Sequence, residues 1–241
     1  MLRIAAIDPQ RNSLAVLFAA ALCMGSALAP AARAEGAAVP SAWADFSGEP
    51  ASNDVRRLAD WVVAARDNAS MPFVIIDKVA AKVFVFDVRG RLSGAAPALL
   101  GLTRGDDTAP GVGERKLAAV GPKDRTTPAG RFVASLGRDL GTRDVLWVDY
   151  KSGVALHRVI TTNPREHRLR RLASPSPLER RISYGCINVP AAFFDKIIDP
   201  AFAATSGVVY ILPETRPIEQ VFVGFTSSMQ PGRQLTSQES R

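Results

Sequence analysis

The sequence has few of the residues that build metal sites and disulfide frameworks: its 241 residues include two cysteines and two histidines. Cys23 lies in an apolar N-terminal region, so Cys186 is a lone cysteine if that region is removed. One cysteine cannot form an intramolecular disulfide, and two histidines with one cysteine at this spacing make no standard zinc site. We therefore expect neither a metal ion nor a disulfide framework.

Motifs for nucleotides and nucleic acids are also missing. No glycine-rich phosphate-binding loop precedes a predicted helix, so we expect no nucleotide or other cofactor, and there is no internal repeat. The formal net charge of +7 favours contact with an anionic surface or substrate. Because the chain has no zinc-knuckle spacing, basic repeat or aromatic RNA-binding motif, we do not expect this partner to be nucleic acid.

The N-terminal apolar stretch is too short for a typical membrane span. Residues 14–29 are almost wholly apolar, whereas a helix that crosses a bilayer needs about 20 residues. Arg3 and Arg11 precede the stretch and Ala32-Arg33-Ala34 follows it, which is the layout of a secretory signal peptide. We predict a signal peptide over residues 1–34 and a periplasmic or otherwise exported mature protein, with no stable membrane span after cleavage.

Beyond residue 34, the hydrophobic pattern predicts many short strands and few helices. Val55, Leu58 and Val62 recur at helical spacing, which predicts a helix over residues 54–67. A second helix is expected from Pro190 to about residue 198. Short apolar runs predict strands over residues 73–76, 83–86, 96–100, 131–136, 145–150, 154–159, 208–212 and 221–225. Because no βαβ unit repeats, these elements favour a mainly β fold.

The same pattern divides the mature chain into three parts. Residues 35–71 are predicted to be a linker and an N-terminal helix, residues 72–226 a single folded domain, and residues 227–241 a flexible polar tail. Two segments inside the domain show little periodicity, residues 101–130 and the basic residues 160–182. We expect both segments to be long loops.

Cys186 is the strongest candidate for a reactive residue. It lies in the segment Ser183-Tyr184-Gly185-Cys186-Ile187-Asn188. A lone thiol in an oxidising compartment is at risk of oxidation unless it is buried or functional. One interpretation is a buried structural cysteine, which packs as a small hydrophobic side chain. The functional interpretation is favoured by Gly185, which lets the backbone approach a substrate closely, and by nearby N–H groups that are candidate donors to a carbonyl oxygen.

A nucleophilic cysteine needs a base, and the chain offers only His157 and His167. His157 follows an apolar run and is expected on a strand, where its position is fixed. His167 lies in Pro164-Arg165-Glu166-His167-Arg168, which is typical of a loop. We predict that His157 is the base; the alternative is that both histidines are ordinary packed or solvated residues.

The cysteine segment resembles the Ser-His-Gly-Cys-hydrophobic-Asn/Arg segment of the L,D-transpeptidase (YkuD-like) family at Ser183, Gly185, Cys186, Ile187 and Asn188. Residues 127–132 are similar to the Thr-Pro-x-Gly-x-Phe stretch of that family, and the resemblance covers residues 72–213. It implies an L,D-transpeptidase-like β-sandwich with a few peripheral helices, which would make residues 72–226 the catalytic domain.

The resemblance also implies roles for individual residues. Cys186 is the expected nucleophile and His157 the expected acid and base, while Ser183 and Gly185 belong to the catalytic segment and help to hold the site. Asn188 is expected to bind substrate or to orient the loop.

Two features depart from the family pattern. Tyr184 stands where the family has histidine; tyrosine can donate a hydrogen bond and pack, but it is a poor base near neutral pH. The segment between His157 and Ser183 is longer than usual, and His167 would fit the usual spacing. The strand context still favours His157, because an insertion in the following loop costs little stability.

The longer segment is basic. Its arginines include Arg165 and Arg168, and arginine binds carboxylates in a bidentate manner. We predict that these arginines hold the carboxylates of an anionic peptide stem and that Tyr184 and Asn188 also belong to the substrate-binding residues. The alternative is a solvated surface loop.

The function that the resemblance implies is that of an L,D-transpeptidase acting on peptidoglycan peptide stems through a cysteine thioester. The thioester would be attacked by an amine of an acceptor stem or of a protein, in cell-wall cross-linking or protein attachment. One alternative is a cysteine peptidoglycan hydrolase on the same fold, an L,D-carboxypeptidase or amidase-like enzyme, in which water replaces the amine. Another is a non-catalytic wall-binding protein.

Overall fold

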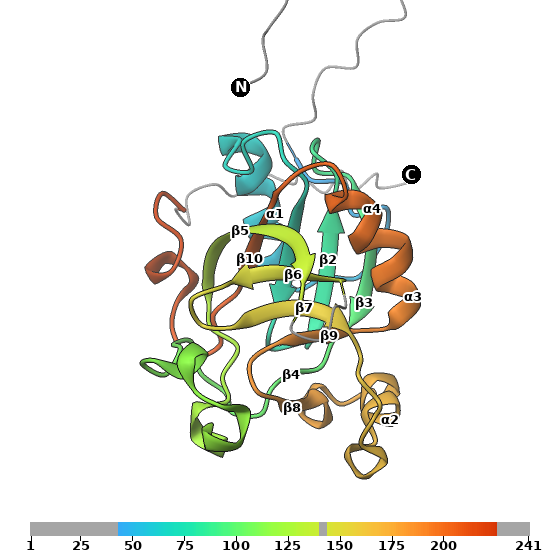
Figure 1. Ribbon diagram of the computed structural model, residues 1–241. Coiled ribbons are helices and arrows are strands. Elements are labelled where there is room, and N and C mark those ends of the chain that lie inside the picture. Colours follow the sequence, from blue (N-terminus) through green and yellow to red (C-terminus); the bar gives the residue numbers. More distant parts are fainter. Residues whose placement is uncertain (1–42, 140–143, 226–241) are drawn as a thin grey trace, which may run out of the picture. The chain divides into compact units, whose positions relative to one another are not determined.

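The structure is a computed structural model that describes residues 43–139 and 144–225 (Figure 1). The predicted signal peptide, the start of the predicted linker and the predicted tail lie outside the described residues.

The strands are β1 (Phe73–Asp77), β2 (Lys82–Phe86), β3 (Leu92–Pro97), β4 (Leu100–Gly101), β5 (Gly130–Arg138), β6 (Asp144–Asp149), β7 (Val154–Arg158), β8 (Arg181–Ser183), β9 (Ile187–Val189) and β10 (Gly207–Ile211). The helices are α1 (Asn53–Ala65), α2 (Arg168–Ala173), α3 (Ala191–Phe193) and α4 (Asp199–Phe202), with a π-helical turn, Phe194–Ile198, between the last two. In these two ranges no helix has the length and apolar character needed to cross a bilayer.

Eight of the strands form one mixed sheet in the order β3-β2-β1-β10-β5-β6-β7-β9, and β4 pairs with β8. β5 belongs to both halves of the large sheet: residues 130–134 pair with β10, whereas residues 135–138 pair with β6. Because the two ends of one strand have different neighbours, the sheet turns at β5, and β6, β7 and β9 cross in front of β1 and β2 (Figure 1). The prediction of a mainly β fold is confirmed.

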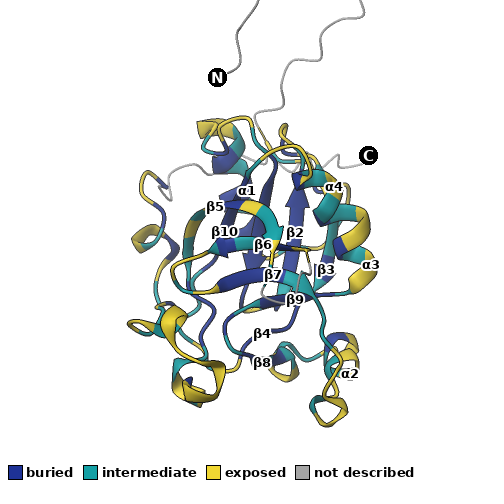
Figure 2. Ribbon diagram, viewed as in Figure 1, coloured by how far each residue is buried: buried dark blue, intermediate teal, exposed yellow. Residues whose placement is uncertain are grey.

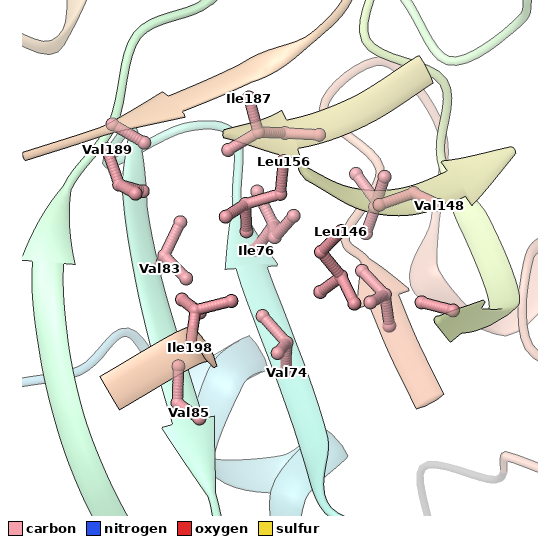
Figure 3. Packing of buried hydrophobic residues seen from close by; sticks show 14 of the residues in the cluster. Val74, Ile76, Val83, Val85, Leu146, Val148, Leu156, Ile187, Val189 and Ile198 are labelled. Atoms are coloured by element: carbon pink, nitrogen blue, oxygen red, sulfur yellow. The ribbon is translucent and has the colours of Figure 1, made fainter. Parts of the chain in front are cut away.

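The first hydrophobic core lies between these two halves of the sheet. Val74 and Ile76 of β1 face Leu146 of β6, Leu156 of β7 and Ile187 of β9 (Figure 3). Side chains alternate between the faces of a strand, so every second residue of β1 enters this core. Burial of one such side chain contributes about 1.5–3 kcal/mol. The core thereby ties β7 and β9, which carry the candidate site, to the rest of the domain.

A second core lies where α1 covers the other face of β1, β2 and β10. Ser52 caps the helix, because its side chain accepts a hydrogen bond from the N–H of Val55 at 3.3 Å. Trp61 and Val62 are buried against the sheet. The helix predicted over residues 54–67 is confirmed, with bounds that differ by one or two residues.

The described part of the predicted linker contributes to the second core. Phe46 is buried against Phe84 and Phe86 of β2, with ring centroids 6.2 and 5.2 Å apart. The segment around Phe46 is rich in small residues and shows no periodicity, so the sequence gives no sign of this contact.

The strand predicted over residues 221–225 is wrong. These residues follow a 3-10 turn at Ile218–Gln220 and form no strand. Phe222 and Phe225 are buried in the second core, whereas Val223 is 98% exposed. Two aromatic side chains anchor this irregular segment to the core. Together with the valines beside them they form an apolar run that resembles a strand in the sequence.

Two segments near the candidate site differ from the prediction. The strand predicted over residues 96–100 is split between the end of β3 and the start of β4. Between them, Leu99 exchanges two backbone hydrogen bonds of 2.8 and 2.9 Å with Asn188 of β9. The predicted loop over residues 160–182 contains α2 and two 3-10 turns, and α2 carries exposed residues on its outer side (Figure 2).

Candidate active site around Cys186

A tight turn between β8 and β9 carries Cys186. The hydroxyl of Ser183 donates to the backbone oxygen of Cys186 at 2.6 Å and accepts from the N–H of Gly185 at 3.1 Å. Ser183 is only 3% exposed, so its hydroxyl serves the turn rather than solvent. The N–H of Gly185, one of the donors expected for a substrate carbonyl, is used within the turn. Ser183 therefore shapes the segment that presents the thiol.

Gly185 and Thr127 fix this turn against the loop that precedes β5. Gly185 has a φ of +129°, and a Cβ there would lie 2.9 Å from the backbone oxygen of Thr126, so both conformation and space favour glycine. The buried hydroxyl of Thr127 donates to the oxygen of Gly185 at 2.8 Å and accepts from the N–H of Gly101 at 2.9 Å. The sequence places Thr127 in a family-like stretch but gives no sign of this contact, because it depends on the tertiary fold.

The parallel strands β7 and β9 bring His157 beside Asn188. The preceding pair, Leu156 and Ile187, points into the first core, so His157 and Asn188 point to the opposite face. Cys186 lies in the turn just before β9, and its backbone oxygen is 3.5 Å from Asn188 Nδ2. The structure thus brings the backbone of the predicted nucleophile, the predicted base and the asparagine together at one edge of the sheet.

His167 has a different environment. It is exposed, with a φ of +49°, between the 3-10 turn Pro164–Glu166 and α2. This left-handed conformation is typical of a surface turn. Of the two histidines, His157 is the one that the strand pairing fixes beside the cysteine segment.

Hydrogen bonds define the protonation of His157. Arg168 Nη1 donates to Asn188 Oδ1 at 2.6 Å, and since arginine has only donors, the other amide atom, Nδ2, faces His157. Asn188 Nδ2 lies 3.4 Å from His157 Nε2, which therefore acts as the acceptor. His157 Nδ1 then carries the proton and donates it to the backbone oxygen of Arg158 at 2.7 Å. The result is a neutral imidazole whose Nε2 lone pair faces Asn188 Nδ2, so this contact has to be exchanged for the thiol before Nε2 can act as a general base.

The thiol of Cys186 lies next to the residues that start β7. Its Sγ donates toward the backbone oxygen of Gly153 at 3.6 Å, and the residue as a whole is half-buried. Burial raises the pKa of the Cys186 thiol, while the N–H of Ala155 and the positive charge of Arg168 act to lower it. A thiol with a raised pKa stays protonated at neutral pH, so its activation requires a base.

Several arginines of the basic segment (residues 160–182) bind the protein itself. Arg171 donates to backbone oxygens within the segment, and Arg180 donates to that of Ser174 within it and to that of Ala81 outside it. Arg181 forms a salt bridge with Glu214 at 2.6 Å. Arg165 is exposed on the first 3-10 turn of the segment. The segment is therefore anchored to the domain by its own charges.

Tyr184 is paired with an arginine that the sequence did not single out. The guanidinium carbon of Arg125 lies 3.9 Å from the centroid of the Tyr184 ring, and Arg125 Nε donates to the oxygen of Val120 at 3.1 Å. Such a cation–π contact stabilises by about 0.5–1 kcal/mol at an exposed site. Arg125 comes from a loop without periodicity, so no pattern in the sequence could have revealed it.

A buried charge cluster, formed by Lys78, Asp106, Arg181 and Glu214, is connected to the cysteine turn. Lys78 Nζ is fully buried, 2.7 Å from Asp106 and 3.8 Å from Glu214, and it donates to the backbone oxygen of Thr127 at 3.0 Å. Burial lowers the pKa of Lys78 although Asp106 acts to raise it. Burial also acts to raise the pKa of Asp106, but hydrogen bonds from Lys78 and its other donors hold that pKa well below its usual range. Through Thr127, the cluster supports the residue that fixes Gly185.

A cavity of about 430 Å³ borders His157, and its lining includes Asp144, Arg158 and Ile160. It offers space for a small group beside the imidazole. In the part of the chain that the structure describes, no three histidine, cysteine, aspartate or glutamate side chains are grouped so as to hold a metal ion.

Comparisons with known proteins give a distant likeness among solved structures. No family model and no curated protein matches the chain. Among solved structures, the chain is similar to the NMR structure of the catalytic domain from an E. faecium L,D-transpeptidase. The identity is 13%, the match covers 59% of this chain and 98% of that chain, and the TM-score is 0.34. A TM-score this low carries no argument about the site, so the function of this chain has to be inferred from its own residues.

Proposed function

We propose that this protein is an exported L,D-transpeptidase that acts on peptidoglycan peptide stems through a thioester on Cys186. The observation that carries the proposal is the pairing of β7 with β9, which sets His157 beside Asn188, the second residue after Cys186. The neutral imidazole with Nε2 as acceptor supports a role as general base. The match of the cysteine segment to the L,D-transpeptidase pattern supplies the substrate class.

The reaction begins when the thiol of Cys186 leaves the oxygen of Gly153, replaces the Asn188 amide at Nε2 of His157 and transfers its proton to that nitrogen. The sulfur then forms a bond to the carbonyl carbon of the third stem residue. As the bond from this carbon to the nitrogen of D-alanine breaks, the imidazolium returns its proton to the leaving amine. The thioester on Cys186 retains the rest of the stem.

The second half-reaction releases the enzyme. An acceptor amine attacks the thioester carbon and gives its proton to Nε2 of His157. The carbon–sulfur bond breaks, a new amide forms, and the thiolate of Cys186 takes the proton back. The carbonyl oxygen that becomes negative in both steps needs donors other than the N–H of Gly185, which Ser183 already occupies.

The test is product analysis with the purified full chain and a disaccharide-tetrapeptide. Release of D-alanine together with a cross-linked product, dependent on an acceptor amine, supports transpeptidation. Release of D-alanine with the tripeptide alone, whatever amine is added, would show a hydrolase instead. No release of D-alanine in either condition would contradict acyl transfer on this substrate. Cys186→Ala is the matched control, since it removes the thiol with little change in volume.

A further inference from the structure

Arg168 is turned into the protein rather than toward the surface. Its side chain is 11% exposed at the start of α2. Its Nε donates to the carboxylate of Glu166, and its Nη1 donates to Asn188 Oδ1 at 2.6 Å. A guanidinium that captures a substrate carboxylate presents its donors as a free fork. In Arg168, donors on two of its nitrogens are already engaged by protein oxygens.

Two contacts orient the amide of Asn188: Oδ1 accepts from Arg168 at 2.6 Å, and Nδ2 donates more weakly to the backbone oxygen of Cys186 at 3.5 Å. An asparagine amide can present either its oxygen or its NH₂ group to a neighbour. With Oδ1 held by Arg168, Nδ2 faces His157, and Nε2 of the imidazole must be an acceptor. If Oδ1 faced His157 instead, the favoured form would carry the proton on Nε2, and the neutral ring could not accept the thiol proton there.

We propose that Arg168 is a positioning residue, which locks the Asn188 amide so that His157 keeps its lone pair on Nε2. This inference rests on the proposed function only for its catalytic consequence, because the orientation of the amide is a property of the free protein. Glu166, Arg168, Asn188 and His157 form one connected set, which we call the site chain.

The positive charge of Arg168 also supports its role as a positioning residue. Arg168 lies close enough to Cys186 for its positive charge to act on the thiol. The other charged groups around the pair are Glu166, bound to Arg168, and the residues Asp139, Asp144 and Arg158, which line the cavity beside His157. Arg158 is paired with Asp195 at 2.6 Å. Loss of Arg168 therefore removes both the lock on Asn188 and a cation that favours the thiolate.

The direct test is ¹⁵N NMR of the histidine side chains in the full chain, at a pH above the ordinary imidazole pKa of about 6.5. The sequence has only two histidines, so the spectrum is simple, and a His167→Gln variant assigns the signals. We expect His157 to carry its proton on Nδ1 in the parent protein. We expect Arg168→Met to introduce a population with the proton on Nε2, and Arg168→Lys to give a smaller change. A parent protein with the proton on Nε2, or an Arg168→Met spectrum identical to the parent, would overturn the proposal.

Kinetics separate positioning from substrate capture. Arg168→Met should lower kcat about 10–100-fold with KM nearly unchanged, because Arg168 does not touch the substrate in this account. It should also move the pH profile of Cys186 alkylation by iodoacetamide to higher pH. Arg170→Met, an exposed arginine on the same helix, should change neither quantity. A raised KM with unchanged kcat in Arg168→Met would instead make Arg168 a substrate-binding residue.

The two proposals can fail separately. If the tautomer responds to Arg168→Met but the parent protein releases no D-alanine, the positioning role stands and the transpeptidase proposal falls. If D-alanine is released but Arg168→Met changes neither the tautomer nor the alkylation profile, the transpeptidase proposal stands and the positioning role falls. Thermal unfolding of each variant shows whether it is folded, and Arg168→Lys provides the milder change if Arg168→Met is not.

Discussion

The buried charge cluster and the site chain both connect to the cysteine segment. They differ in whether their side chains can still exchange a proton with a substrate. In the cluster, Lys78, Asp106 and Glu214 are at most 1% exposed, and each charge meets an opposite charge. The cluster reaches the cysteine segment through Thr127, whose backbone oxygen accepts from Lys78, and through Arg181, which begins the strand that ends at Ser183. Its charges are satisfied among themselves, so it can hold the fold in place but cannot exchange a proton with a substrate.

The site chain begins with a charged pair and ends on neutral groups. The side chain of Glu166 is 30% exposed and that of Arg168 is 11% exposed. From this pair the site chain continues through Asn188 to the imidazole of His157. Asn188 and His157 are neutral, so the charged pair Glu166 and Arg168 orients them without forming an ion pair with the imidazole. Charge therefore fixes the position of groups in the buried charge cluster, whereas in the site chain it sets the protonation state of His157.

The largest expected effect is on the reaction and comes from the end of the site chain. His157→Gln should lower kcat/KM by about 10²–10⁴-fold, because it removes the general base. The fold should persist, since His157 points away from the first core. His167→Gln is the matched control and should retain activity. Both are measured by D-alanine release, and loss of activity in the His167 variant alone would move the base to His167.

The charge cluster should respond in stability. Asp106→Ala leaves Lys78 buried without its nearest anion and should cost about 3–5 kcal/mol in the free energy of unfolding. Asp107→Ala is the control: Asp107 is 81% exposed in its ion pair with Arg216, so the cost should be about 0–1 kcal/mol. Denaturant unfolding measures both. Equal effects would mean that the buried cluster is no more important than a surface pair.

The cluster also predicts a direction for the effect of acid. The pKa of Asp106 is depressed in the folded protein, so its contribution is present above the ordinary aspartate pKa of about 3.9 and is lost as pH falls through the lower, folded-state value. The stability difference between the parent protein and Asp106→Ala should therefore shrink in acid. A difference that grows as pH falls would contradict the assigned hydrogen bonds.

Thr127 joins the two regions and should show an intermediate effect. Thr127→Val removes a buried hydroxyl that bridges Gly101 and Gly185, and should cost about 1–3 kcal/mol. Because Gly185 precedes Cys186, the rate of thiol alkylation should change as well. Thr127→Ser keeps the hydroxyl and should restore much of the stability. Equal free energies of unfolding for Thr127→Val and Thr127→Ser would show that the hydrogen bonds of the Thr127 hydroxyl do not contribute to stability.

The smallest effect is expected at the rim of the site. A double-mutant cycle with Arg125→Met and Tyr184→Leu should give a coupling energy of about 0.5–1 kcal/mol in unfolding experiments. The coupling tests whether Tyr184 is held by Arg125. Coupling close to zero would show that the cation–π contact has no energetic role.

The sequence predicted the parts of the site that depend on local pattern. Cys186 stands out as a lone cysteine, and His157 follows a strand-like run, so both could be found without the fold. The central strands could be predicted for the same reason, since alternation and apolar runs are local properties.

Other features depend on contacts between distant parts of the chain. Lys78 looks like an ordinary surface lysine after β1, and only the approach of Asp106 and Glu214 makes its burial favourable. The basic segment was predicted to be a loop that binds carboxylates, whereas the structure directs Arg168 to Asn188. A run of arginines reveals a positive charge but not which protein oxygens will bind it.

The most direct test of the central claim is mass spectrometry of the purified protein mixed with a disaccharide-tetrapeptide. The account predicts an adduct with the mass of the substrate minus D-alanine, and peptide mapping should place it on Cys186. The adduct should be absent from Cys186→Ala and should disappear when an acceptor amine is added. An unmodified Cys186 in a folded protein that still turns over the substrate, or an adduct on another residue, would contradict the account.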